Sequence, residues 1–261
     1  MCGRYWLVTP ADVLASRFRV RGERAPLLPR WNAAPGQDLP VVRLDAATGA
    51  RVLEPMRWGL VPSWAVRPED AGRPINARAE TAAGKPTFKE PLRRSRALVP
   101  ADGFFEWKKG DRGREPVAFR LKSRRPFAFA GIFDTWTPRS GPPLRTFAIL
   151  TTRPNELVAP VHDRMPLILA PEGEDLWLDP KAQDPELLAP LLVPPGAGEM
   201  EAFPVSRRVN SPANDDASVL DPSGPETPLA PRGRAAPEGQ RDLWENEDDD
   251  RDDGGGGGNA P

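Results

Sequence analysis

The sequence has 261 residues, of which 28% are charged and 39% are hydrophobic, a composition typical of a folded, water-soluble chain. It contains no run of about 20 apolar residues, no leader with a basic and then an apolar stretch, and only one cysteine. We therefore expect a cytoplasmic protein with no membrane contact and no internal disulfide. Charge is uneven: residues 222–261 hold ten acidic residues and four arginines, a net −6, which leaves +5 on residues 1–221 out of the total of −1.

In chain order, the predicted elements begin with a helix from Pro10 to about Phe18, with Thr9 as its N-cap. Short β-like runs separated by turn residues then predict strands at Val41–Leu44, Arg96–Val99, Gly103–Trp107, Val117–Leu121, Phe127–Ile132 and Phe147–Thr151. Helices are expected at Asp175–Leu178 and Pro185–Leu192, followed by a returning strand at Phe203–Val209. The fold class predicted for residues 1–221 is a compact α+β single domain, with central, mostly antiparallel β-structure and a few short helices.

Residues 222–261 differ in composition from the rest of the chain. They are rich in Pro, Gly, Ala and Arg, and they end in an acidic run, Glu247–Asp250, and five consecutive glycines. So little apolar surface predicts a disordered acidic tail, in which Trp244 is the one residue that could dock locally. A solvated tail is the favoured interpretation; competition with an anionic ligand for the basic domain is the alternative.

The residues that could carry chemistry are few. One Cys and one His cannot build a structural zinc site, and the chain has no Walker loop or dinucleotide fingerprint, so we expect no metal and no cofactor. Removal of Met1 would leave Cys2 with a free α-amino group of pKa about 8 and a thiol of pKa about 8.5. Such a residue suits N-terminal nucleophile hydrolysis, or capture of an aldehyde as a Schiff base that the sulfur closes into a thiazolidine. Position alone also allows an incidental cysteine.

Besides Cys2, the chain contains several motifs that are five to nine residues long. They are Met1–Tyr5, Met56–Trp64, Ile75–Thr81, Ala101–Trp107, Val161–Pro166 and Pro204–Asn210. Together and in this order they resemble the SOS-response-associated peptidase (SRAP) family, over about residues 1–221. The resemblance implies a protein of the DNA damage response that crosslinks abasic sites in single-stranded DNA, with a basic DNA groove leading to Cys2. The matching catalytic positions are Cys2, Asn76, Glu106 and His162.

Each matching position has a hypothetical role. Glu106 lies between Phe105 and Trp107, so desolvation is expected to raise its pKa and make it the acid/base that opens the abasic sugar. His162, the sole imidazole, suits proton transfer near neutral pH. Asn76 is expected to hold the Cys2 amine or a substrate oxygen through amide hydrogen bonds.

Further residues are expected to contact DNA. Arg78 and Arg164 each follow a catalytic position by two residues and could bind phosphate, and Arg4 offers a third cation near Cys2. The turn at Pro62 and the indole of Trp64 could stack an exposed base, whereas Trp58 is expected in the core. Thr151 matches a family position near the active site, although Thr152 beside it weakens that match.

Two alternatives stay open at this point. Cys2 could serve a peptidase or amidohydrolase, as the family's title implies, or it could be incidental in a non-covalent module for damaged DNA. A crosslinking enzyme could fall into the hydrolase or the lyase class. A monomer is expected, associated with the nucleoid if the source is bacterial, and the sequence identifies no replication or repair protein as a partner.

Overall fold

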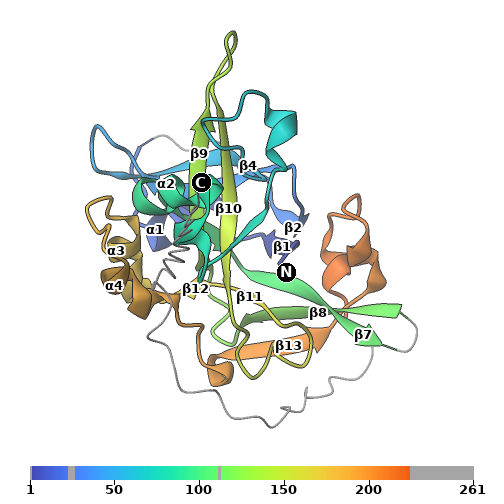
Figure 1. The fold of residues 1–261 in the computed structure, drawn as a ribbon. Helices are drawn as coiled ribbons and strands as arrows, with labels where there is room; N and C mark the ends of the chain where they lie inside the picture. Colours follow the sequence, from blue (N-terminus) through green and yellow to red (C-terminus); the bar gives the residue numbers. More distant parts are fainter. Residues whose placement is uncertain (1, 23–26, 111–112, 224–261) are drawn as a thin grey trace, which may run out of the picture.

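The computed structural model describes residues 2–22, 27–110 and 113–223, so the predictions for the acidic tail and Trp244 fall outside the described residues. Two β-sheets dominate this part of the chain (Figure 1). The smaller sheet has the strand order β13-β8-β7-β1-β2, and all its pairings are antiparallel. Its strands are β1 (Tyr5–Leu7), β2 (Arg30–Ala33), β7 (Gly103–Gly110), β8 (Gly113–Leu121) and β13 (Met200–Pro204).

The larger sheet closes on itself. Its order is β11-β10-β4-β3-β6-β9-β12, and β10 also pairs with β9, so β10, β4, β3, β6 and β9 form a ring. The pairings are antiparallel except those of β10 with β4 and β5. Its strands are β3 (Asp38–Leu44), β4 (Arg51–Trp58), β5 (Asn76–Arg78), β6 (Arg96–Ala101), β9 (Phe127–Trp136), β10 (Leu144–Thr152), β11 (Met165–Pro166) and β12 (Ile168–Leu169).

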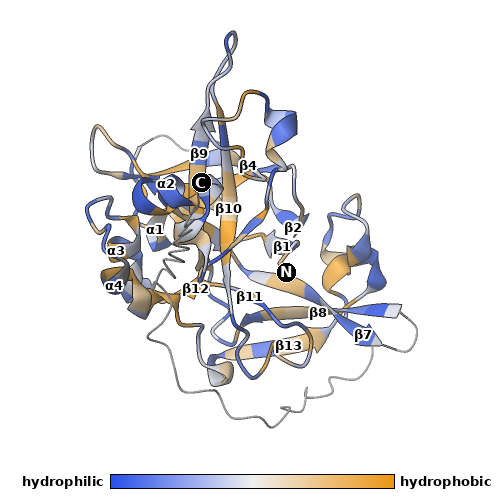
Figure 2. Cartoon of the chain, in the orientation of Figure 1, coloured by the Kyte–Doolittle hydropathy of each residue, from blue (hydrophilic) through white to orange (hydrophobic). Residues whose placement is uncertain are grey.

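Short helices cover one side of the ring (Figure 1). They are α1 (Ala11–Arg17), α2 (Pro86–Arg94), α3 (Glu174–Leu178) and α4 (Pro185–Leu188), and 3-10 turns lie at Pro68–Ala71, Ala82–Gly84, Pro171–Gly173, Ala189–Leu192, Ala197–Glu199, Arg207–Asn210 and Ala217–Leu220. Hydrophobic residues line the middle of β10, whereas α2 carries hydrophilic residues on its outer side (Figure 2). None of the helices in the described residues could span a membrane. The α+β class and the mostly antiparallel sheets are confirmed.

Most of the predicted elements agree with the structure, and two details differ from it. All six predicted strands before residue 152 lie within observed strands, and both predicted later helices are helical. The returning strand at Phe203–Val209 was wrong, because β13 ends at Pro204 and the Ser206 hydroxyl accepts the Arg208 N–H to cap a 3-10 turn. Thr9 is not the N-cap of α1, which Pro10 occupies; the Thr9 hydroxyl instead donates to Asp102 at 2.6 Å.

The chain passes between the two sheets at Asp102. Its carboxylate accepts the backbone N–H groups of Val8 (2.6 Å) and Thr9 (2.9 Å), which ties the end of β1 to the junction of β6 and β7. The next residue must be glycine, because a Cβ at Gly103 would come within 2.0 Å of the Trp6 ring. This junction therefore fixes where β7 begins, and with it the position of Glu106 three residues later.

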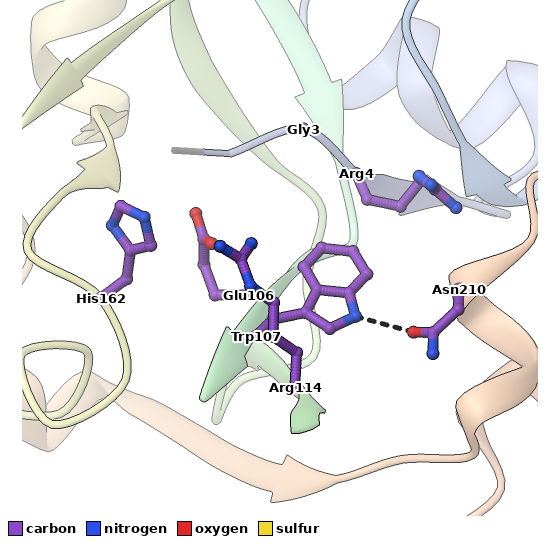
Figure 3. Close-up of a pocket in the computed structure, with 7 residues that line it drawn as sticks. All are labelled: Gly3, Arg4, Glu106, Trp107, Arg114, His162 and Asn210. Carbon is purple, nitrogen blue, oxygen red and sulfur yellow. Dashed lines mark hydrogen bonds between the residues drawn. The ribbon is translucent and has the colours of Figure 1, made fainter. Parts of the chain in front are cut away.

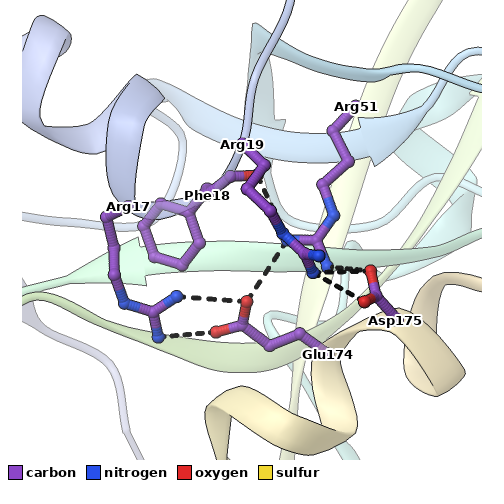
Figure 4. Close-up of polar contacts among 6 residues, drawn as sticks. All are labelled: Arg17, Phe18, Arg19, Arg51, Glu174 and Asp175. Atoms are coloured by element: carbon purple, nitrogen blue, oxygen red, sulfur yellow. Dashed lines mark hydrogen bonds and ion pairs between the residues drawn. The ribbon is translucent and has the colours of Figure 1, made fainter.

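A polar cluster fastens the helical side to the ring (Figure 4). Glu174, 1% exposed, binds Arg17 of α1 at 2.7 Å and Arg51 of β4 at 3.3 Å. Asp175 joins Arg51 to Arg19. Because the buried carboxylate meets two guanidinium groups, its negative charge is compensated inside the fold.

Candidate functional site

Cys2 lies just before β1, between the two sheets. Its side chain is completely buried within the main core, and the thiol donates a long contact of 3.8 Å to the Arg4 carbonyl. Burial raises the pKa of the Cys2 thiol, and the nearby charge of Glu106 raises it further. The thiol therefore keeps its proton at neutral pH until a base accepts it.

Asn76 holds the backbone of Cys2. It opens β5, which runs parallel to β10 with Asn76 opposite Ile149, and its Nδ2 donates to the Cys2 carbonyl at 2.8 Å. The other end of the same amide, Oδ1, is buried and accepts no hydrogen bond from the described residues. Asn76 thus contacts Cys2 through its carbonyl, whereas the prediction named the Cys2 amine or a substrate oxygen, and an acceptor remains available beside the Cys2 backbone.

Glu106 lies on β7 and is 2% exposed. Burial raises its pKa to about 7, as the flanking aromatic residues had led us to expect. At neutral pH the group is therefore present in both protonation states, which is the condition for an efficient acid/base. Figure 3 shows its carboxylate between the His162 imidazole and the Trp107 indole.

His162 lies in the loop before β11. Its Nδ1 accepts the backbone N–H of Arg164 at 3.0 Å, and burial lowers its pKa. The exposed carboxylate of Asp163 lies 2.9 Å from the same nitrogen, which would favour the charged ring. We assign the neutral ring with its proton on Nε2, because the backbone N–H needs an acceptor at Nδ1 and burial opposes the charge.

Glu106 and His162 meet at an open pocket of about 460 Å³, which Gly3, the neighbour of Cys2, also lines (Figure 3). Its far wall is built from the Trp107 indole, whose Nε1 donates to Asn210 at 2.7 Å, and from the Arg4 guanidinium 5.8 Å from the Trp107 ring centre. The lining residues are Gly3, Arg4, Glu106, Trp107, Arg114, His162 and Asn210. Arg114 and Asn210 were not among the predicted site residues, although Asn210 closes the last motif of the sequence.

Two of the predicted phosphate-binding arginines are already engaged. Arg164 forms two hydrogen bonds with Glu80, at 2.6 and 2.7 Å, and one with the Thr151 carbonyl at 2.5 Å. Arg4 donates to Asn32 at 2.8 Å and to the Val209 carbonyl at 2.7 Å. Arg164 is therefore better placed to position the His162 loop than to bind phosphate. Arg4 lines the pocket, and its hydrogen bonds hold the far wall in place.

The remaining predicted contacts lie around the site or further away. Arg78 is exposed opposite Thr151, whose buried hydroxyl lies 3.4 Å from the Ala77 carbonyl. Pro62 is buried, Trp64 is 63% exposed, and Trp58 is in the core as expected. Among the described residues, no cluster of three or more His, Cys, Asp or Glu side chains could hold a metal ion.

The fold and the site define a class: an α+β protein in which a buried cysteine lies next to a pocket lined by a carboxyl group, an imidazole and two arginines. The profile of the family "SOS response associated peptidase (SRAP)" matches residues 1–212. The chain therefore belongs to the SRAP family, as its motifs had predicted.

Individual relatives agree with this assignment. The abasic site processing protein YoqW of Bacillus subtilis is 42% identical over 227 residues, which cover 85% of this chain and 99% of the relative. The abasic site processing protein HMCES of Gallus gallus is 36% identical over 74% of this chain and 66% of its own length. A crystal structure of a protein from Bacteroides thetaiotaomicron superposes with a TM-score of 0.77 at 28% identity, covering 85% of this chain and 100% of that one.

Proposed function

We propose that this protein recognises abasic sites in single-stranded DNA and shields them as a covalent thiazolidine crosslink, formed by the α-amino group and thiol of Cys2 once Met1 has been removed. The observation that carries the proposal is the convergence of Asn76, Glu106 and His162, from three separate segments, on Cys2 and the pocket in front of it. The relatives named as abasic site processing proteins support the substrate class.

The chemistry balances with the loss of one water. The ring-opened abasic sugar presents an aldehyde, whose carbon the Cys2 amine attacks to give a carbinolamine. Loss of the hydroxyl group as water, with a proton supplied by an acid, leaves a protonated imine, and the sulfur then adds to the same carbon. The nitrogen keeps its hydrogen as the ring N–H of the thiazolidine, and the thiol proton restores the acid. Ring closure is intramolecular, so it proceeds at high effective concentration.

The surrounding residues supply the proton transfers. Protonated Glu106 donates to the departing hydroxyl group, and the resulting carboxylate accepts the proton of the buried thiol, whose raised pKa otherwise keeps it unreactive. His162, neutral and carrying its proton on Nε2, hydrogen-bonds to the oxygens of the opened sugar. The available Oδ1 of Asn76 accepts from the Cys2 amine, so one amide fixes both ends of the Cys2 backbone.

DNA contact falls to the exposed groups around the pocket. Arg78 and Arg114 are exposed, and neither forms an ion pair within the described part of the chain, so both are available to phosphates. Trp64, exposed beyond the ring of strands, offers a face for base stacking. We propose a monomer that acts in the cytoplasm, or at the nucleoid if the source is bacterial, and a domain boundary at residue 221.

The test uses an oligonucleotide with a single abasic site, a denaturing gel and intact-mass measurement. The expected adduct has the mass of the protein without Met1 plus the DNA, less one water, and Cys2→Ser abolishes it. A wild-type protein that binds this DNA but forms no adduct refutes the crosslinking function.

A second candidate is amide hydrolysis by the same thiol. It is favoured by the acid/base group beside a cysteine and by the peptidase in the family's title. Cys2-dependent cleavage of a peptide library, without any DNA adduct, would support it. If Cys2→Ser instead retained every measurable activity, the protein would be a non-covalent binder of damaged DNA.

A further inference from the structure

The β7–β8 hairpin carries an unfavourable pair of charges beside the pocket. Lys109 and Arg114 lie directly opposite each other in the antiparallel register, and both are exposed. Neither forms an ion pair with a described residue; the turn residues Asp111 and Arg112 lie outside that part, and their formal charges cancel. Like charges directly opposite on a sheet destabilise it, so the hairpin holds two cations without internal compensation. Such a pair is suited to an anionic ligand.

The described chain ends next to this hairpin. Ser223 donates its hydroxyl to the Val205 carbonyl at 2.7 Å and its N–H to the Pro204 carbonyl at 3.2 Å. Pro204 pairs with Val117 on β8, three residues from Arg114 along the same strand. At about 3.3 Å per residue, the chain leaves the fold roughly 10 Å from the Arg114 position.

The sequence that follows is acidic. Eight carboxylates lie between Asp242 and Asp253, with Trp244 among them, against only one arginine, Arg251. The 18 residues from 224 to 241 can span up to about 60 Å, which is long enough for the acidic segment to reach the hairpin and the pocket. Tethering keeps it at high local concentration there, and its charge is opposite to the +5 of residues 1–221.

We propose that the acidic segment Asp242–Asp253 binds the cationic hairpin at Lys109 and Arg114 and competes with DNA for the pocket. The carboxylates of the segment take the positions that DNA phosphates would occupy, and the Trp244 indole takes the position of a base. The contact is weak and sensitive to salt, because it joins exposed charges. Undamaged nucleic acid is held off by this competition, whereas an abasic strand is retained because its adduct is covalent. Only the identity of the displaced ligand rests on the proposed function.

The first test measures binding of undamaged single-stranded DNA by full-length protein. Asp248→Asn, Asp249→Asn and Asp250→Asn together should tighten binding about three- to tenfold at about 50 mM salt, with the gain lost near 300 mM. The matched control, Asp12→Asn, Glu172→Gln and Glu186→Gln, changes the net charge equally on the helical side, away from the hairpin (Figure 1), and should change affinity less than twofold. Equal effects of the two variants would overturn the proposal.

The second test needs no DNA and therefore separates this inference from the proposed function. A zero-length carbodiimide joins lysine amines to nearby carboxylates, and peptide mapping identifies the pairs. The acidic segment should couple to Lys109 in preference to Lys89 on α2, and Arg114→Gln or high salt should reduce that coupling. If the segment coupled equally to all exposed lysines, it would have no preferred binding site on the hairpin, and the proposal would be wrong.

Discussion

Replacing Glu106 by glutamine should stabilise the folded protein at alkaline pH while it slows the chemistry. The carboxyl group is 2% exposed, and its pKa is about 7 in the fold against an ordinary value of 4.5. Each pKa unit corresponds to about 1.4 kcal/mol, so ionising this group in the folded state costs about 3 kcal/mol. Glutamine has nearly the same shape as the neutral acid and never incurs that cost.

The sign of the effect follows from the two pKa values. An unfolded chain releases the Glu106 proton near pH 4.5, whereas the folded chain retains it until about pH 7. The wild-type free energy of unfolding should therefore fall between pH 4.5 and 7. Above pH 7 it should be lower by the full cost of ionising Glu106 in the folded state. Glu106→Gln lacks this fall, so it should match wild type near pH 4 and exceed it by up to about 3 kcal/mol at pH 8.

Urea unfolding at pH 4, 6 and 8 measures this difference, and Glu115→Gln, an exposed residue on the facing strand, is the matched control. In parallel, single-turnover crosslinking to abasic DNA should slow about 10²- to 10⁴-fold in Glu106→Gln, the usual contribution of a positioned acid/base. Stability curves of wild type and Glu106→Gln that stay parallel from pH 4 to 8, or crosslinking at the native rate, would refute the reasoning.

Three other variants test separate parts of the site. Asn76→Ala removes the 2.8 Å bond to the Cys2 carbonyl and should slow crosslinking at least tenfold with DNA affinity unchanged, as measured on a non-reactive abasic analogue; a native rate would contradict the positioning role. Arg164→Ala leaves Glu80 without its partner and should cost about 2 kcal/mol of unfolding free energy, which Glu80→Ala in the same chain should partly restore. Trp64→Ala, at a 63% exposed side chain, should leave the melting temperature unchanged and weaken single-stranded DNA binding by about 1–3 kcal/mol if one base stacks there.

The sequence predicted the elements whose patterns are local and regular. The apolar runs at Phe127–Ile132 and Phe147–Thr151 lie in β9 and β10. The raised pKa of Glu106, which burial causes, was predicted from the aromatic residues beside it in the sequence. It missed β4 and α2, because Pro55 lies within the strand and Pro86 and Pro91 lie within the helix. Their stability comes from pairing and packing in the ring, which no local pattern reveals.

The site shows the same division. Motif resemblance named Cys2, Asn76, Glu106 and His162, and the structure brings these residues to one place. The motifs did not reveal that Arg164 pairs with Glu80, because these two residues are 84 positions apart in the sequence. Asn210 escaped notice for a similar reason: its bond to Trp107 spans 103 positions.

The order in which the chain is synthesised has a consequence for the placement of Cys2 at the junction of the two sheets. Cys2 precedes its partners in the chain, because β1 must wait for β7 and the pocket wall at Asn210 emerges later still. A nascent chain thus carries its thiol through most of translation with no site around it. Specific capture of a DNA aldehyde in the pocket should therefore arise only near the end of folding, and truncated products ending before residue 210 should react no faster than an unfolded N-terminal cysteine.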